Sequence, residues 1–83
     1  MEIPSGTVIN YYRALGVARI KVTSALEVGS RIHIKGHTTD FDQTVESLQI
    51  QKQGVHRATA GEIVGLKVKD FVRKNDRVYR VEE

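Results

Sequence analysis

The chain has 83 residues, with 13 Lys and Arg against 10 Asp and Glu, and it contains no cysteine. This length fits one small domain over residues 1–83, with a thin core and little chain left for an elaborate active site. The lack of cysteine excludes disulfides, thiolate zinc sites, iron–sulfur clusters and a cysteine nucleophile. The formal net charge of +3 is compatible with a nucleic-acid partner without requiring one.

The N-terminus lacks the pattern of a signal peptide. An acidic residue, Glu2, stands where a basic region belongs, and no apolar stretch follows it. The longest run of apolar residues and glycine, residues 14–18, is far shorter than the ~18 residues that indicate a membrane span. We therefore expect a soluble cytoplasmic protein with no membrane partner.

The first half of the chain predicts three strands. Thr7–Tyr12 is rich in strand-forming residues, and Val17–Val22 alternates between apolar and basic residues. After a turn at residues 27–30, Arg31–Lys35 shows the clearest period of two, and Gly36 ends it. The outward positions of the two alternating segments are all basic: Arg19, Lys21, Arg31, His33 and Lys35.

The second half predicts two further strands and contains one ambiguous segment. Residues 64–68 alternate, and residues 78–81 follow a polar turn. Between them and the first half, three apolar residues have the i, i+4, i+7 spacing of a helix: Phe41, Val45 and Leu48. Residues 44–50 are equally compatible with a strand that contains a β-bulge. Periodicity alone leaves helix and strand open here.

Short strands at a spacing of about 8–12 residues, separated by turn residues, predict an all-β fold. We expect a single small closed antiparallel Greek-key β-barrel of about six strands, because closure removes the exposed edges that so short a chain cannot cover. The expected core residues are Ile20, Val22, Ile32, Ile34, Leu48, Ile50, Val64, Leu66 and Val68.

The residues give little support for catalysis. The phosphate-binding, dinucleotide-binding and nucleophile-elbow motifs are absent. His33 and His37 would converge on a metal only on one helix face, and the strand pattern and Gly36 argue against a helix. A loop metal site that adds Asp40 and Asp42 is an alternative to ordinary surface histidines beside a turn. We expect no enzymatic activity, no metal and no cofactor.

Two clusters of basic residues are candidates for a nucleic-acid contact. One is the outward face of the two alternating segments, which forms a single stripe if the two strands are neighbours, and the other lies in residues 73–80. Such a stripe can follow a phosphate backbone, while Tyr11 and Tyr12 can stack on bases. The alternative is a solvated strand face, on which Lys and Arg are common and on which acids are here interleaved.

Four motifs, in order along the chain, resemble the β-barrel second domain of the translational GTPases, of which elongation factor Tu is the best-known member. Residues 26–36 (LEVGSRIHIKG) resemble its segment φ-x-V-G-D-x-φ-x-φ-x-G, and residues 44–50 resemble the strand that follows. Residues 60–68 match its A-G-[DE]-x-V-G-φ-x-φ motif, and residues 75–79 resemble its closing strand. The resemblance covers about residues 6–81 and implies that the ambiguous segment is a strand.

The resemblance implies a non-catalytic binding module that contacts tRNA or ribosomal RNA. In that family a Val-Glu pair contributes to the pocket for the terminal adenine of tRNA, and Val45 and Glu46 match the pair, whereas Gln49 replaces a nearby basic residue. The nucleotide-binding domain has no counterpart, so no nucleotide hydrolysis is expected. The expected RNA-contacting residues are Arg19, Lys21, Arg31, His33, Lys35, Val45 and Glu46.

Three glycines in these motifs are expected to shape the backbone. Gly29 and Gly61 precede strands at turns, where a positive φ angle is needed. Gly65 lies inside a strand pattern, which indicates a bulge or a close backbone approach, either for simple barrel geometry or for a ligand.

A second interpretation is a protein–protein adaptor. Barrels related to the translation-factor domain also occur as accessory tails on other proteins, including collagenase-like peptidases. On this interpretation the chain is an accessory barrel that acts with a separate enzyme, such as a peptidase or a GTPase.

Overall fold

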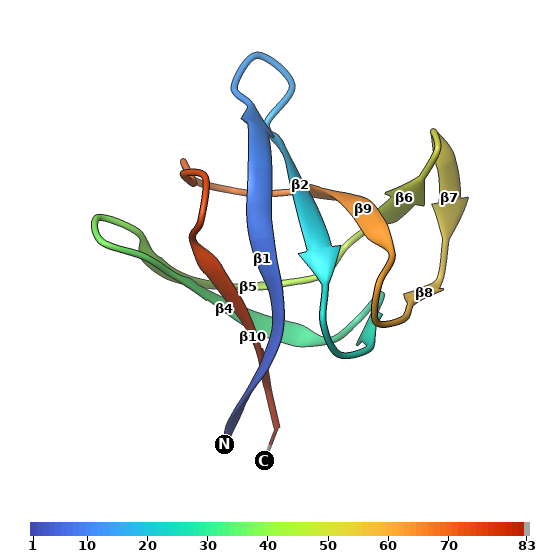
Figure 1. The fold of residues 1–83 in the computed structure, drawn as a ribbon, viewed down its shortest axis with the longest axis horizontal. Coiled ribbons are helices and arrows are strands. Elements are labelled where there is room, and N and C mark those ends of the chain that lie inside the picture. Colours follow the sequence, from blue (N-terminus) through green and yellow to red (C-terminus); the bar gives the residue numbers. More distant parts are fainter. Residues whose placement is uncertain (83) are drawn as a thin grey trace.

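The computed structural model describes residues 1–82, and within them the regular structure consists of β-strands with no helix (Figure 1). Ten strands follow one another: β1 (Glu2–Tyr12), β2 (Val17–Val22), β3 (Leu26–Glu27), β4 (Arg31–Lys35), β5 (Asp40–Thr44), β6 (Leu48–Ile50), β7 (Gln53–Val55), β8 (Arg57–Ala58), β9 (Ile63–Lys67) and β10 (Arg77–Val81). No segment of the described chain forms a helix that could span a membrane.

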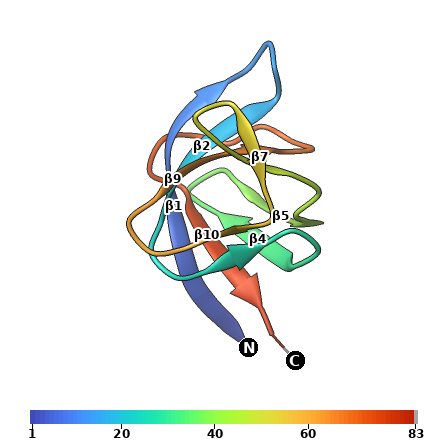
Figure 2. The same cartoon turned by 90° about the vertical axis from the view of Figure 1, so that its right-hand side faces the viewer.

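Eight of the strands form one antiparallel sheet in the order β5-β4-β10-β1-β2-β9-β6-β7, and β3 pairs with β8 in a separate two-stranded sheet. The large sheet curves around the core, as the two perpendicular views show (Figures 1 and 2). Strands β1 and β10 carry the two ends of the described chain and lie side by side. The expected all-β antiparallel class is thus confirmed, while the strand count exceeds the expected six.

The alternation of apolar and polar residues correctly predicted the boundaries of two strands. β2 has the expected bounds, Val17–Val22, and β4 has the expected bounds, Arg31–Lys35. In both, every second side chain is buried because the pleat sends successive side chains to opposite faces. β1 extends further than the Thr7–Tyr12 segment, because residues 2–6 also pair with β10.

The ambiguous segment contains strands rather than a helix, but it is not one continuous strand over residues 44–50. β5 ends at Thr44 and β6 begins at Leu48. In the link between them, the backbone N–H of Val45 donates to Ser30 O at 2.8 Å, and Gly29 N–H donates to Val45 O at 2.8 Å. These hydrogen bonds tie the link to the β3–β4 turn and interrupt the strand.

The expected closed barrel is not found. Within residues 1–82, β5 and β7 form the two edges of the large sheet, and no further strand pairs with either of them. At the β5 edge the side chain of Gln43 takes the place of a backbone ladder: its Nε2 donates to Lys67 O at 2.9 Å, and its Oε1 accepts from Lys69 N at 3.0 Å. A side-chain amide therefore spans the distance to the end of β9, where closure would need paired backbone.

One cluster of buried residues fills the inside of the curved sheet. Eight of the nine expected core residues are buried; the exception, Ile50, is half-buried. The core also includes seven residues outside that expected set: Val8, Ala18, Leu26, Val45, Ala58, Val72 and Val78. Most of these lie in short strands or in links, where too few residues repeat to show a period.

Candidate functional site

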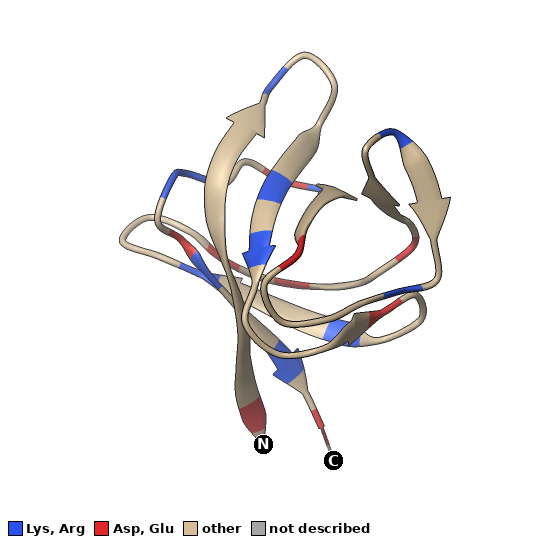
Figure 3. Cartoon of the chain, turned by 45° about the vertical axis from the view of Figure 1, so that its right-hand side comes forward, with Lys and Arg blue, Asp and Glu red and all other residues tan. Residues whose placement is uncertain are grey.

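The two strands that carry the expected basic face are not neighbours. β10 and β1 lie between β4 and β2, so Arg19 and Lys21 of β2 belong to a different part of the sheet from the basic residues of β4. In Figure 3 the blue segments are correspondingly distributed over separate strands rather than joined in one stripe. The expectation of a continuous basic face formed by adjacent β2 and β4 is therefore wrong.

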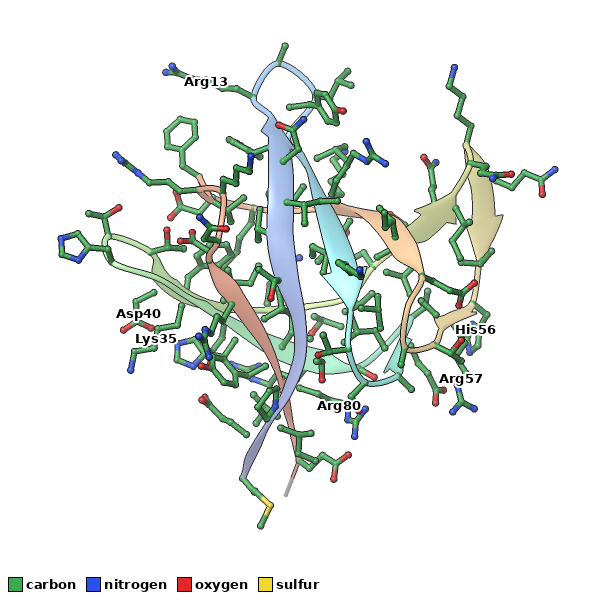
Figure 4. All side chains as sticks on the ribbon, viewed as in Figure 1. Arg13, Lys35, Asp40, His56, Arg57 and Arg80 are labelled. Carbon is green, nitrogen blue, oxygen red and sulfur yellow. The ribbon has the colours of Figure 1, made fainter. Side chains whose placement is uncertain are left out.

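On the β4 side, acidic side chains lie opposite the basic ones. Strand β4 pairs with β5, which places Asp42 opposite His33 and Asp40 opposite Lys35. Arg31 Nη2 lies 3.4 Å from Asp42 Oδ2. Lys35 and Asp40 are labelled side by side in Figure 4. A phosphate backbone would have to compete with these carboxylates for the same cations.

His33 is held between carboxylates on both ring nitrogens. Its Nδ1 lies 2.5 Å from Glu2 Oε2, and its Nε2 contacts Asp40 Oδ1. The hydrogen bond with Asp40 is the main cause that raises the pKa of His33; partial burial opposes the rise, and Glu2 and Asp42 add to it. The same hydrogen bond lowers the pKa of Asp40. The doubly protonated ring donates from both nitrogens, so this geometry favours the imidazolium form.

The loop metal site that would combine His33, His37, Asp40 and Asp42 does not assemble. Within residues 1–82, no group of three or more His, Asp or Glu side chains is placed to hold a metal ion. Instead His33 uses both of its nitrogens on carboxylates, while His37 is exposed in the turn between β4 and β5. The cluster is an ion-pair network that joins β4 to β1 and β5.

The structure separates Val45 and Glu46 by burial. The side chain of Val45 is fully buried in the core, so it is not accessible to a ligand. Glu46 follows it in the link between β5 and β6 and is exposed.

Two of the three expected backbone glycines have positive φ angles. Gly29 has φ +95° and Gly61 has φ +93°, both in turns. Gly65 differs, because its strand pairs with β2 and β6 without a shift of register, so no bulge lies at this position. A Cβ atom built on Gly65 would lie 3.5 Å from Val17 Cγ1, which is an ordinary contact distance. Neither turn geometry nor backbone packing therefore requires glycine at position 65.

A groove of about 700 Å³ lies over Gly65 on the outer face of the sheet. Its walls come from the tips of the β1–β2 and β6–β7 hairpins, which rise on either side of β9 (Figure 3). Residues that line it include Tyr12, Leu15, Arg19, Lys52, Ile63 and Gly65.

The two hairpins place apolar and basic side chains at the rim of this groove. The β1–β2 turn exposes Leu15, whose surface is 69% accessible. The β6–β7 turn is tight, with positive φ angles at Gln51 (51°) and Lys52 (67°), the conformation that matches the twist of a two-residue hairpin. Sequence reasoning missed this groove, although an apolar Leu15 in an exposed turn and a glycine within a strand were visible signals.

The groove is lined by two cations, Arg19 and Lys52, and by one acid, Glu62. Within residues 1–82, neither Arg19 nor Lys52 has a carboxylate within 4.0 Å. The acid that lines the groove, Glu62, accepts hydrogen bonds from the backbone N–H of Thr59 at 2.7 Å and from its hydroxyl at 3.0 Å. These bonds lower the pKa of Glu62 and hold its carboxylate within its own turn. The groove thus combines an apolar lining with two cations that have no carboxylate within 4.0 Å and one carboxylate that is bonded to Thr59.

Beside the β1–β2 hairpin, the exposed ring of Phe71 already contacts other side chains of this chain. The rings of Tyr11 and Phe71 meet edge to face, with centroids 6.2 Å apart. The guanidinium of Arg13, labelled in Figure 4, lies 5.0 Å from the centroid of Phe71. Because Arg13 already stacks on Phe71, these two side chains are less available to a ligand than the side chains of the groove.

Comparison with known proteins relates this chain to peptidases. No protein-family model matches it. The chain is 40% identical over 83 residues to an uncharacterized protease of Methanocaldococcus jannaschii, and 38% identical over 84 residues to a collagenase of Porphyromonas gingivalis. Each match covers 99% of this chain but 20% of the relative, so the chain spans about a fifth of the length of these proteins.

The fold matches that of a solved peptidase domain. The C-terminal domain of a Geobacillus thermoleovorans protein described as a U32 peptidase superposes with a TM-score of 0.90, covering 98% of this chain and 93% of that domain at 20% identity. None of these relatives is described as a translation factor or an RNA-binding protein. The resemblance to the second domain of the translational GTPases is therefore wrong, and the RNA-binding function it implied has no support: the chain is similar to about a fifth of a protease and shares the fold of a U32 peptidase C-terminal domain.

Proposed function

We propose that residues 1–83 form one non-catalytic accessory domain that binds a protein carrying a peptidase catalytic module. The observation that carries the proposal is the extent of the similarity: 99% of this chain aligns with only 20% of a protease. The remaining four-fifths of that relative is long enough to contain a catalytic module. For the present chain, such a module would lie either on the same polypeptide or on a separate one.

The histidine cluster and the groove support a binding role rather than a catalytic one. A nucleophile needs a free base within hydrogen-bond reach. His33 has both ring nitrogens on carboxylates, so it offers no free nitrogen to activate a hydroxyl group. The groove over Gly65 contains cations and apolar side chains, which suit recognition of another protein.

The test is capture of a partner from nuclease-treated extract of the source cells by the tagged 83-residue chain. We expect one protein in stoichiometric amount, identified by mass spectrometry as carrying a peptidase module, and no cleavage of labelled casein by the chain alone. An unrelated domain that carries the same tag is the control. Casein cleavage by the purified chain, or a protein that is captured only from extract without nuclease treatment, would contradict the proposal.

A further inference from the structure

We propose that the groove over Gly65 binds an extended acidic segment of the partner protein, with a bulky apolar side chain of that segment seated on Gly65. This inference rests on the proposed function and deepens it, because it names the docking surface and the chemistry that the surface recognises.

The apolar part of the argument is the convergence of exposed side chains. Among the described residues five large apolar side chains are exposed, and three of them line this groove: Tyr12 (41%), Leu15 (69%) and Ile63 (40%). Of the other two, Met1 is the first residue and Phe71 packs against Tyr11. Exposed apolar side chains that gather at one site mark an interaction surface, whereas isolated ones need no explanation.

The glycine at the floor of the groove has no structural reason in this fold. Glycine inside a strand is destabilising, and position 65 has room for a Cβ at ordinary contact distance. What the missing side chain does provide is an open floor between Ile63 and Lys67 on the outer face of β9. A ligand side chain can lie there against Val17, in the space that a larger residue would fill.

The charges specify the second feature of the ligand. In the register of β2 and β9, Arg19 lies directly opposite Gly65, so its guanidinium borders the floor. Lys52 lies on the β6–β7 rim, and Glu62 is held by Thr59. A carboxylate next to the apolar side chain of the ligand would meet Arg19 in the bidentate geometry that guanidinium groups favour.

The lining favours a peptide over a nucleic acid. Single-stranded nucleic acids bind on several aromatic planes along a line of cations. This groove offers one aromatic ring, Tyr12, and otherwise aliphatic walls from Leu15, Ile50 and Ile63. Aliphatic walls with one or two cations suit an extended peptide that alternates an acidic and an apolar side chain.

The experiment is a titration of the ¹⁵N-labelled chain, followed by amide chemical shifts, with the capped pentapeptide Thr-Asp-Leu-Asp-Thr. We expect shift changes concentrated at the groove residues. The dissociation constant should be at least about tenfold larger for a peptide in which Leu is replaced by Ala, and for one in which both Asp are replaced by Asn. Gly65→Val, which fills the floor, and Arg19→Glu, which reverses the charge, should each weaken binding by at least about tenfold. Gly65→Ala should cause a smaller loss.

Arg31→Glu is the matched control, because it makes the same charge reversal on β4, away from the groove. It should leave the dissociation constant within about twofold, and the dispersion of the amide spectrum shows for each variant that the fold is intact. Shift changes centred elsewhere, equal binding by Gly65→Val, groove shifts on simple dilution of the chain, or groove shifts with a uridine oligonucleotide but not with the peptide would each overturn the inference.

The result separates this inference from the proposed function. If Gly65→Val and Arg19→Glu still capture the peptidase partner as well as the unmodified chain does, the groove is not the docking surface, while the accessory function stands. If the peptide binds in the groove but no protein partner is captured, the accessory function fails and the groove assignment stands.

Discussion

Strands β4 and β2 both project basic residues outward, but they present different surfaces. On β4 the residues opposite in the ladder are the acids of β5, and Arg31 and His33 are paired with carboxylates. On β2, Arg19 and Lys21 face Gly65 and Ile63 of β9. The difference shows that the charge available on a sheet belongs to the cross-strand pair and not to the single strand.

The two surfaces also differ in shape. The histidine cluster draws together β1, β4 and β5 around His33, whose side chain is only 15% accessible. The β2–β9 surface is left open by Gly65 and bordered by two hairpin tips. One region is thus stabilised by contacts within the chain, while the other is an open groove with a glycine floor.

The largest expected effect concerns the core that both surfaces share. Ile34→Asp, beneath the histidine cluster, and Leu66→Asp, beneath the groove, each bury an unpaired carboxylate in place of a fully buried side chain. Each should unfold the domain at room temperature, since the cost of several kcal/mol is a large part of the stability of so small a protein. Circular dichroism melts measure this, with the exposed Gln49→Asp as control. A wild-type melting temperature for either variant would show that the inward orientation of that side chain is wrong.

A comparison of two glycines tests whether Gly65 is structural. At Gly6 a Cβ would lie 2.6 Å from Ile20 Cγ2 and 3.0 Å from Lys21 O, so Gly6→Ala should destabilise the fold by about 1–3 kcal/mol. At Gly65 the nearest atom is 3.5 Å away, so Gly65→Ala should leave the free energy of unfolding unchanged or raise it by up to about 1 kcal/mol. Urea denaturation gives both values. A loss at Gly65 as large as that at Gly6 would remove the evidence that its missing side chain serves the groove.

The histidine cluster should show its own pH dependence. Because the pKa of His33 is raised above its ordinary value of 6.5, the stability it contributes is fully present below pH 6.5 and is lost as the pH rises through the raised value. The pKa of Asp40 is lowered from 3.8, so its contribution is present above pH 3.8 and is lost as the pH falls through the lowered value. His33→Gln should therefore lower the melting temperature most between pH 3.8 and 6.5 and little at alkaline pH.

His37→Gln is the control for this pH series, because His37 is exposed in the β4–β5 turn. It should follow the wild-type melting curve at every pH. A constant difference between wild type and His33→Gln across the series would mean that packing of the ring, and not its charge, stabilises the cluster.

The smallest expected change in stability distinguishes Arg31, which forms an ion pair, from Arg19, which forms none within residues 1–82. Arg31→Ala removes an exposed ion pair with Asp42 at 3.4 Å and should cost about 0.5 kcal/mol or less. Arg19→Ala removes a cation with no carboxylate within 4.0 Å in residues 1–82, so the free energy of unfolding should not fall. Urea denaturation at low salt gives the best resolution, and a larger loss for Arg19→Ala would reveal an intramolecular role for that side chain.

Much of the secondary structure could be predicted from the sequence, and little of the site could. Where five or six residues alternate, as in β2 and β4, the period of two located the strand and its inward face. β3, β7 and β8 have two or three residues, too few to show a period. Arg19 and Gly65 were each noticed for local reasons, but nothing in the local pattern indicated that they lie opposite each other.

The sequence by itself determined the all-β class, the longer strands and the side of each of these strands that is buried. The reason is local: apolar residues that alternate along a strand all lie on one face, and the hydrophobic effect buries that face. Only the tertiary structure decided which strands are neighbours, that the eight-stranded sheet keeps two edges, and that two hairpin tips enclose a groove over Gly65. The physical reason is that register joins residues far apart in the chain: Arg19 meets Gly65, and His33 meets Glu2 and Asp40, through pairings that no local pattern contains.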